Sequence, residues 1–170
     1  MKLVVPDIFY KESYADALNE SLAECISPEQ TLSEVKNIEG TIQHKLDAGN
    51  GINLRSGEVM RSEFWLIDDE KYIGNIQIRY SPSGRTAESA SHIYYEIRPS
   101  QRKKKYGTEI LKRGLMEASI LGLSEVIITC EKGNIPSQKI IEANGGEFLE
   151  EIRMEGGERP LLKYRIALPE

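Results

Sequence analysis

The stretch between residues 91 and 130 switches from the hydrophobic spacing of a strand to that of a helix and back again. Residues 91–97 form a short β-rich run, residues 106–121 place apolar side chains on one helical face, and residues 125–130 form a continuous apolar run. A helix that joins two neighbouring strands of one sheet leaves those strands parallel. The stretch therefore predicts a central βαβ unit, which limits the fold to the mixed α/β class.

The flanking segments predict helices near the N-terminus and antiparallel strands on both sides of this unit. Residues 12–26 and 31–48 each repeat apolar side chains at helical spacing, with Ser27-Pro28 between them. Residues 63–67 and 71–80 alternate apolar and polar side chains, which predicts a hairpin. The remaining expected elements are a loop over 81–90, a helix over 135–143, and strands over 147–154 and 161–168 joined by a turn at 155–158.

These elements predict one domain spanning residues 1–170, in the α/β (α+β) class. The expected sheet is mixed and mostly antiparallel, with the central βαβ unit inside it and helices on both faces. The length lies in the range of about 100 to 200 residues that one domain usually occupies.

Charge and cysteine content narrow the partners that we expect. The chain has 22 Lys and Arg against 27 Asp and Glu, a formal net charge of -5, which opposes general attraction to nucleic acids or anionic membranes. Cys25 and Cys130 lie far apart without ligand spacing, so we expect no metal and no disulfide framework. No apolar run reaches the roughly 18 residues of a membrane span. These features predict a reduced, soluble, cytoplasmic protein.

Five basic residues stand just before or at the start of the predicted helix over 106–121: Arg98, Arg102, Lys103, Lys104 and Lys105. A helix N-terminus is already positive, so added cations are unfavourable there unless an anion binds. Phosphate oxygens would be held by the free N–H groups of the first turn. A phosphate cradle is one interpretation, and a solvated basic loop or a short nucleic-acid patch is the other.

Three linked segments resemble the GNAT acetyltransferase family. Residues 102–107, Arg-Lys-Lys-Lys-Tyr-Gly, are similar to its loop pattern Q/R-x-x-G-x-G/A. Residues 92–100 resemble its fourth strand, and residues 127–146 resemble its fifth strand and the following helix. The resemblance covers about residues 63–168 and implies the GNAT acyl-CoA N-acyltransferase fold. It also implies acetyl-CoA as co-substrate, no metal, and direct attack on the thioester by a primary amine.

Lys105 departs from the family pattern, which has a glycine at this position. A lysine there is expected either to keep φ below zero with its side chain turned away or to enlarge the cradle. This substitution bears on how tightly the loop holds the cofactor.

The resemblance also implies the residues that hold acetyl-CoA. The strand edge from Tyr95 to Arg98 would pair with the pantetheine arm, and an N–H near Ile97 would polarise the thioester carbonyl. Asn134 and Ser137 match the step that bonds the arm, although Asn134 equally suits a helix start. The cofactor-binding set is Ile97, Arg98, Arg102, Lys103, Lys104, Lys105, Tyr106, Gly107, Thr108, Asn134, Ser137 and Lys139, the last of which could reach the adenosine phosphates.

One imidazole, one carboxylate and three tyrosines are candidates for proton transfer. His92 has an ordinary pKa near 6.5 and is the first candidate for the base, with Glu96 second and a water chain as the alternative. The family's usual tyrosine acid falls at Ile141, which has no proton to donate. The departing thiolate would then take its proton from water or from one of three tyrosines: Tyr94, Tyr95 and Tyr164.

The acceptor is expected between the N-terminal helices and the loops over 81–90 and 155–159. It could be a small amine or a protein amine, and the chain could be a monomer or a homodimer. Lys105 and Ile141 leave open a second reading, a GNAT-like module that binds acyl-CoA without turnover. A nucleic-acid adaptor is a third reading, which the absence of aromatic residues interleaved with the basic run opposes.

Overall fold

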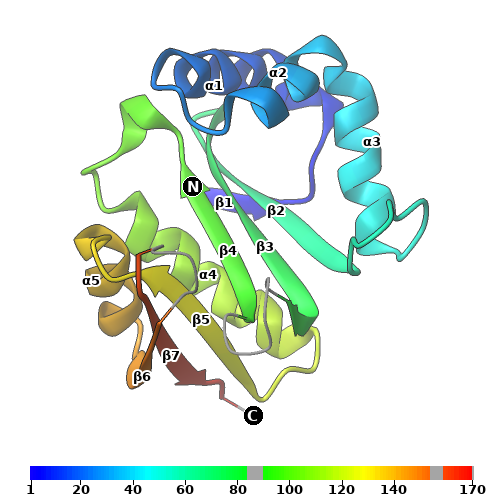
Figure 1. Cartoon of the computed structure of the whole chain (residues 1–170). Helices are drawn as coiled ribbons and strands as arrows, with labels where there is room; N and C mark the ends of the chain where they lie inside the picture. Colours follow the sequence, from blue (N-terminus) through cyan, green and yellow to red (C-terminus); the bar gives the residue numbers. More distant parts are fainter. Residues whose placement is uncertain (84–89, 154–158, 170) are drawn as a thin grey trace.

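The computed structural model describes residues 1–83, 90–153 and 159–169 and arranges them as two sheets with helices around them (Figure 1). The predicted turn at 155–158 and most of the loop over 81–90 lie outside these ranges. The helices are α1 (Lys11–Ala23), α2 (Pro28–Lys36), α3 (Ile38–Gly49), α4 (Tyr106–Ile120) and α5 (Ile135–Ala143), with short 3-10 turns at Ile8–Tyr10 and Pro99–Gln101.

The strands form one four-stranded and one three-stranded sheet. The first sheet has the order β1-β2-β3-β4 and the second has the order β5-β7-β6, with antiparallel pairing throughout. The strands are β1 (Lys2–Val4), β2 (Arg61–Asp68), β3 (Lys71–Ser83), β4 (Ser91–Ile97), β5 (Glu125–Glu131), β6 (Glu147–Ile152) and β7 (Leu161–Ala167). The hairpin of β2 and β3 was predicted, whereas the strand β1 was not.

Helices cover both faces of the first sheet, as the sequence predicted (Figure 1). On one face, Tyr14 and Leu18 of α1 and Ile42 of α3 pack on Trp65 and Tyr72. The other face holds a larger apolar cluster, which joins strands of both sheets to α4 and α5. None of the helices in the described ranges is both long and apolar enough to span a bilayer.

The helix predicted over residues 31–48 is two helices in the structure. Asn37 interrupts it with φ -146° and ψ 68°, and its side chain accepts a hydrogen bond from the Gly40 N–H at 3.0 Å. Asparagine favours such N-cap positions because its side chain satisfies a free backbone donor. The apolar period continues across the break, so period alone could not show it.

The strands β4 and β5, which α4 connects as in the predicted βαβ unit, lie side by side but belong to separate sheets (Figure 1). Two side chains connect their ends near Ser91. The Ser91 hydroxyl donates to the Ile127 carbonyl at 3.3 Å, and the Ile127 N–H donates to His92 Nδ1 at 2.9 Å. These bonds stand where a backbone ladder would begin, and the strands separate beyond them.

A buried ion pair joins α3 to the sheet beneath it. Lys45 Nζ lies 2.9 Å from Glu63 Oε1, and the two side chains are 9% and 1% exposed. Trp65 Nε1 and Gln77 Nε2 also donate to the Glu63 carboxylate, at 3.0 and 3.1 Å. Burial alone would lower the pKa of Lys45, but Glu63 and Glu34 raise it, so the pair stays charged.

We predict that Lys45→Met destabilises the fold by about 3–5 kcal/mol, because it leaves the Glu63 carboxylate buried without a cation. The free energy of unfolding in urea measures this loss. Lys132→Met is the matched control, since Lys132 pairs with Glu151 at 2.7 Å on the exposed surface, and it should cost less than about 1 kcal/mol. Equal losses in the two variants would contradict the prediction.

Candidate functional site

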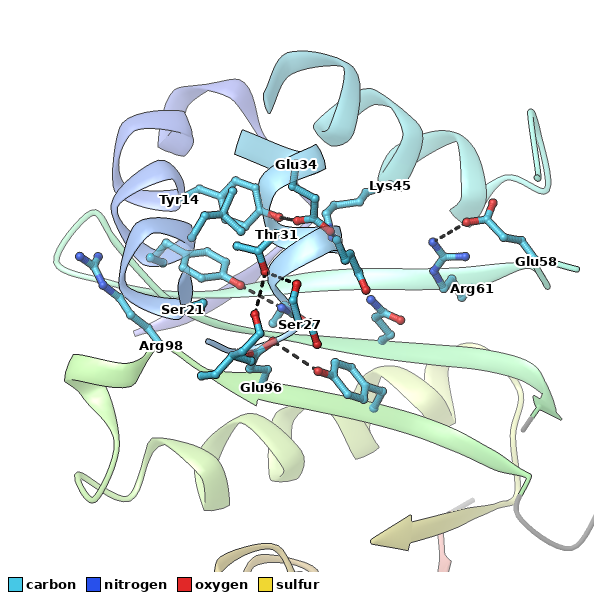
Figure 2. Close-up of a pocket in the computed structure, with 18 of the residues that line it drawn as sticks. Tyr14, Ser21, Ser27, Thr31, Glu34, Lys45, Glu58, Arg61, Glu96 and Arg98 are labelled. Carbon is cyan, nitrogen blue, oxygen red and sulfur yellow. Dashed lines mark hydrogen bonds and ion pairs between the residues drawn. The ribbon is translucent and has the colours of Figure 1, made fainter. Parts of the chain in front are cut away.

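A cavity of about 480 Å³ lies between the N-terminal helices and the first sheet (Figure 2). Its volume falls in the range of roughly 300 to 1,000 Å³ that small-molecule sites occupy. The charged residues that line it are Glu34, Lys45, Glu58, Arg61, Arg79, Glu96 and Arg98. The expected wall of N-terminal helices is therefore present, whereas most residues of the two expected loops lie outside the described ranges.

The floor of the cavity follows from the alternation of side chains along β3 and β4. Asn75, Gln77 and Arg79 project into it from β3, and Tyr94 and Glu96 project from β4. Asn75 pairs with Glu96, and Gln77 pairs with Tyr94, across the ladder. This face of the sheet therefore carries polar side chains beside the apolar cluster of Trp65 and Tyr72, and the polar part lines the cavity.

The roof of the cavity carries a carboxylate that has only neutral partners. The Tyr14 hydroxyl donates a hydrogen bond to Glu34, and Gln30 Nε2 donates to the same carboxylate at 3.2 Å. The Thr31 hydroxyl donates to the Ser27 carbonyl at 3.0 Å and fixes the turn that begins α2. Figure 2 shows Glu34 above the cavity and Glu96 below it.

Glu96 is half-buried in the cavity floor. The Tyr94 hydroxyl donates to its Oε2 at 3.3 Å. Burial raises the pKa of Glu96, and the hydrogen bond from Tyr94 only partly opposes this shift. A carboxylate with a raised pKa inside a cavity is suited to accept a proton from a bound amine.

His92 is placed differently from Glu96. Its Nδ1 accepts the Ile127 N–H, and it is not among the residues that line the cavity. Burial lowers the pKa of His92, and Glu125 opposes this shift. The histidine thus helps to connect β4 with β5, and its role as a base stays a prediction.

The outer edge of β4 faces the gap between the two sheets. The Arg98 N–H donates to the Ile73 carbonyl at 2.8 Å, while Ile97 stands opposite Gly74. Hydrogen-bonded and non-bonded pairs alternate in an antiparallel ladder, so the Ile97 N–H points away from β3. Within the described ranges no acceptor bonds this N–H. The edge can therefore accept another extended chain.

The Tyr95 hydroxyl is buried and, in the described part of the chain, has no hydrogen-bond partner in good geometry. Burial raises the pKa of Tyr95, and the nearby Ser137 side chain lowers it in part. The other candidates differ: Tyr164 packs in the core against Phe148, and Ile141 is fully buried. Tyr95 is thus the unsatisfied phenol of this region.

The basic loop has the backbone of a glycine-rich loop although it holds three lysines. Lys103 and Lys105 have φ angles of 62° and 64°, in the left-handed region, which excludes the first of the two alternatives for Lys105, a φ below zero. Lys105 is the N-cap of α4, and no side chain caps that helix. Left-handed residues before free first-turn N–H groups form a concave anion site.

Two arginines of the expected cofactor set are held by acidic residues of α1. Arg98 Nη2 lies 2.7 Å from Glu20 Oε1, and Arg102 Nη1 lies 2.6 Å from Glu24 Oε2. The Ser100 N–H also donates to Glu20 at 3.0 Å. The sequence gave no signal for these partners, because they are about 78 residues away. The exposed cations of the set are Arg102, Lys103, Lys104, Lys105 and Lys139.

Three other members of the expected set have structural contacts. A Cβ on Gly107 would lie 2.5 Å from Ile140 Cδ1, so this glycine lets α4 approach α5 closely. The Tyr106 hydroxyl donates to Asp68 at 2.8 Å. Asn134 accepts the Ser137 N–H at 3.2 Å and is the N-cap of α5, as its alternative reading predicted.

In residues 1–83, 90–153 and 159–169, no three His, Cys, Asp or Glu side chains gather in a way that could hold a metal ion. Cys130 is buried at the end of β5, and burial raises its pKa to about 11. The candidate site consists of the cavity, the strand edge and the loop before α4.

Comparisons with known proteins identify the family of this domain. The family model of the acetyltransferase (GNAT) domain matches residues 13–147. No curated protein sequence matches the chain. Among solved structures, the microcin C7 self-immunity acetyltransferase MccE, in complex with acetyl-CoA and AMP, is similar with a TM-score of 0.72 and 15% identity, over 98% of this chain and 91% of that one.

Two further structures have the same fold. The putative acetyltransferase yncA from Salmonella typhimurium, with its cofactor acetyl-CoA, has a TM-score of 0.67 and 14% identity, over 99% and 94% of the two chains. The ribosomal-protein-alanine N-acetyltransferase from Brucella melitensis has a TM-score of 0.65 and 14% identity, over 99% and 100%. Identities this low establish a shared fold.

We predict that Lys105→Gly stabilises the protein by up to about 1 kcal/mol, because glycine adopts the left-handed conformation without the clash of a Cβ. Urea unfolding measures the change. Lys104→Gly is the matched control: Lys104 is equally exposed but is not at positive φ, so glycine there should destabilise by roughly 0.5–1 kcal/mol. The same sign for both variants would contradict the prediction.

Proposed function

The chain belongs to the acetyltransferase (GNAT) family, and we propose that it transfers an acetyl group from acetyl-CoA to a primary amine by direct attack. The observation that carries the proposal is the position of Glu96. Its half-buried carboxylate lines the cavity, and it directly precedes Ile97, whose N–H faces the gap beside β4. In the proposal, Glu96 is the proton acceptor on the cavity side of β4, and the N–H of the adjacent Ile97 is the electrostatic donor at its free edge.

Three features of the chain fit acetyl-CoA. The uncapped N-terminus of α4, preceded by Lys103 and Lys105 in left-handed conformation, suits the pyrophosphate. The free edge of β4 suits the pantetheine arm, which carries amide groups that can pair with a strand. Ser137 and Lys139 of α5 would lie along the remainder of the molecule. Acetyl-CoA supplies the thioester whose acyl carbon the amine attacks.

Glu96 would act as the base in this proposal. The acceptor enters the cavity as an ammonium ion, Glu96 takes one proton, and the amine nitrogen forms a bond to the acyl carbon. The Ile97 N–H donates a hydrogen bond to the carbonyl oxygen as negative charge develops on it. The carbon–sulfur bond then breaks and the nitrogen releases its second proton to water, which leaves a neutral amide and the thiolate of CoA.

Tyr95 would supply the proton to the departing thiolate. Its hydroxyl is buried in the region between β4 and α5, where the Ser137 side chain is its neighbour and no described residue bonds it in good geometry. A phenol in this state can donate to a sulfur anion that forms beside the strand edge. The base and the acid then stand on adjacent residues of β4, whose side chains point to opposite faces of the sheet.

We predict that Glu96→Gln leaves the Kd of acetyl-CoA unchanged and lowers the rate of CoA thiol release by about 10²–10⁴-fold, because the amide cannot accept the proton. The assay offers water or a panel of primary amines as acceptor. Because the pKa of Glu96 is raised, wild-type activity should fall as the pH is lowered through a value above 4.5, the ordinary pKa of a glutamate. This acidic limb should be absent in the variant.

Glu12→Gln, on the exposed surface of α1, is the matched control and should behave as wild type. Acetyl-CoA binding without thiol release from the wild-type protein would support the alternative, an acyl-CoA-binding module without turnover. The absence of acetyl-CoA binding would overturn the proposal. An unchanged pH profile in Glu96→Gln would remove Glu96 from the base role and favour His92 or a water chain.

We predict that Tyr95→Phe lowers kcat by about 10²-fold without lowering stability. The hydroxyl that it removes is buried and unpaired, so its loss should leave the thermal midpoint unchanged or raise it. Tyr80→Phe is the control, because the Tyr80 hydroxyl is bonded to Ser62 at 2.9 Å, and it should keep full activity. An active Tyr95→Phe variant would assign the thiolate proton to water.

A further inference from the structure

Some of the charged side chains that line the cavity are paired with an opposite charge of the protein, and others are not. Lys45 is paired with Glu63 at 2.9 Å, and Arg98 is paired with Glu20 at 2.7 Å. These two cations are therefore neutralised within the protein. Two carboxylates and one guanidinium form no ion pair with the described residues, those of Glu34, Glu96 and Arg79. Lys45 acts on Glu34 and Glu96 without direct contact.

Among the described residues, no carboxylate pairs with Arg79. Within the same ranges its Nη1 makes one weak hydrogen bond, to the Ser91 carbonyl at 3.4 Å. Burial lowers the pKa of Arg79, and the neighbouring Arg61 lowers it further. Both effects, together with the lack of a paired carboxylate among the described residues, mean that a bound anion would stabilise the charge of Arg79.

Arg61 stands directly opposite Arg79 in the ladder of β2 and β3. Like charges in such a cross-strand pair repel each other, and an anion between them would remove the repulsion. A guanidinium presents a planar fork of donors that matches carboxylate and phosphate oxygens. Both arginines line the same cavity.

Glu58 does not supply that anion, because its carboxylate is already engaged. It accepts the Arg55 N–H at 2.8 Å, and it lies 3.0 Å from His44 Nε2 and 3.4 Å from Arg61 Nη2. Burial alone would raise the pKa of Glu58, but these three groups lower it to about 2. The Glu58 carboxylate therefore contacts the Arg55 N–H and His44 as well as Arg61. None of these contacts involves Arg79.

The two kinds of unpaired charge lie at different places along the cavity. Glu96 stands opposite Asn75, and Arg79 is four residues farther along β3, which is about 13 Å at the strand rise of roughly 3.3 Å per residue. Figure 2 shows Arg61 and Glu58 toward one end of the cavity, with Glu34 and Glu96 between them and Arg98. The cavity is therefore negative near β4's free edge and positive at the Arg61 end.

We propose that the acceptor is a small molecule that carries a carboxylate or phosphate as well as its amine, and that Arg79, with Arg61, binds this anionic group. The proposal rests on the proposed function, because the amine is placed at Glu96 as the transfer reaction requires. The anion then orients the acceptor, with its amine directed to the strand edge. Arg79 is in these terms a specificity-determining residue at the far end of the cavity.

The test uses inorganic phosphate as the first probe, in the presence of saturating acetyl-CoA so that the loop before α4 is filled. We expect phosphate to raise the thermal midpoint of the wild-type protein, since a ligand of the folded state stabilises it. In Arg79→Gln the Kd of phosphate should be at least about 10-fold weaker. Arg113→Gln, an exposed arginine paired with Glu109, is the matched control and should respond as wild type.

Matched amines identify the anion and its effect on turnover. Triglycine should bind more tightly than triglycine amide, or phosphoethanolamine more tightly than ethanolamine, and Arg79→Gln should abolish the difference. The first pair tests a carboxylate and the second a phosphate. Arg79→Lys keeps the charge without the fork and should fall between wild type and Arg79→Gln.

Each outcome has one meaning. Equal phosphate responses in wild type and Arg79→Gln, or equal affinities within both amine pairs, would overturn the anion subsite. Failure of acetyl-CoA to bind would overturn the proposed function, and the phosphate titration without acetyl-CoA would still test Arg79. Should Arg79→Gln not fold, competition in the wild-type protein decides: phosphate should displace the anionic amines and not their neutral counterparts.

Discussion

The separation of β4 from β5 is the constraint on which the rest of the site depends. A strand edge inside a protein must find partners for its N–H and C=O groups. At one end of β4, the Ser91 hydroxyl and the His92 ring bond the C=O and N–H of Ile127 in β5. At the other end, the Ile97 N–H has no acceptor among the described residues. The fold thus keeps one short length of backbone available, and the cavity and the loop before α4 lie at its two sides.

Helix α1 connects these two sides. Glu20 and Glu24, on one face of α1, hold Arg98 and Arg102 at the beginning of the connection from β4 to α4. Tyr14 and Ser21, from the same helix, line the cavity. The helix that covers the expected acceptor is therefore attached to the loop expected to hold the phosphates. Arg98 and Arg102 contribute to the site through this attachment, which only the three-dimensional structure reveals.

The sequence predicted most elements because their hydrophobic periods are clear, as in β3 and α4. It did not predict the break at Asn37, where a capping side chain ends a helix without a change of period. Among the site residues, the loop was found from the charge pattern around Lys103, and Glu96 was a second choice. Arg79 was missed, because an arginine in a strand carries no signal until the register places it opposite Arg61.

The left-handed backbone at Lys105 has a consequence for how the family pattern is read. As a sequence pattern, the family motif requires glycine, and Lys105 departs from it. As a backbone conformation, the motif requires a positive φ. Lys105, with a φ of 64°, meets this requirement and adds a cation. What such a position requires is then a direction of the backbone amides. Lysine or asparagine can meet that requirement as glycine does, where the surrounding turn holds φ positive.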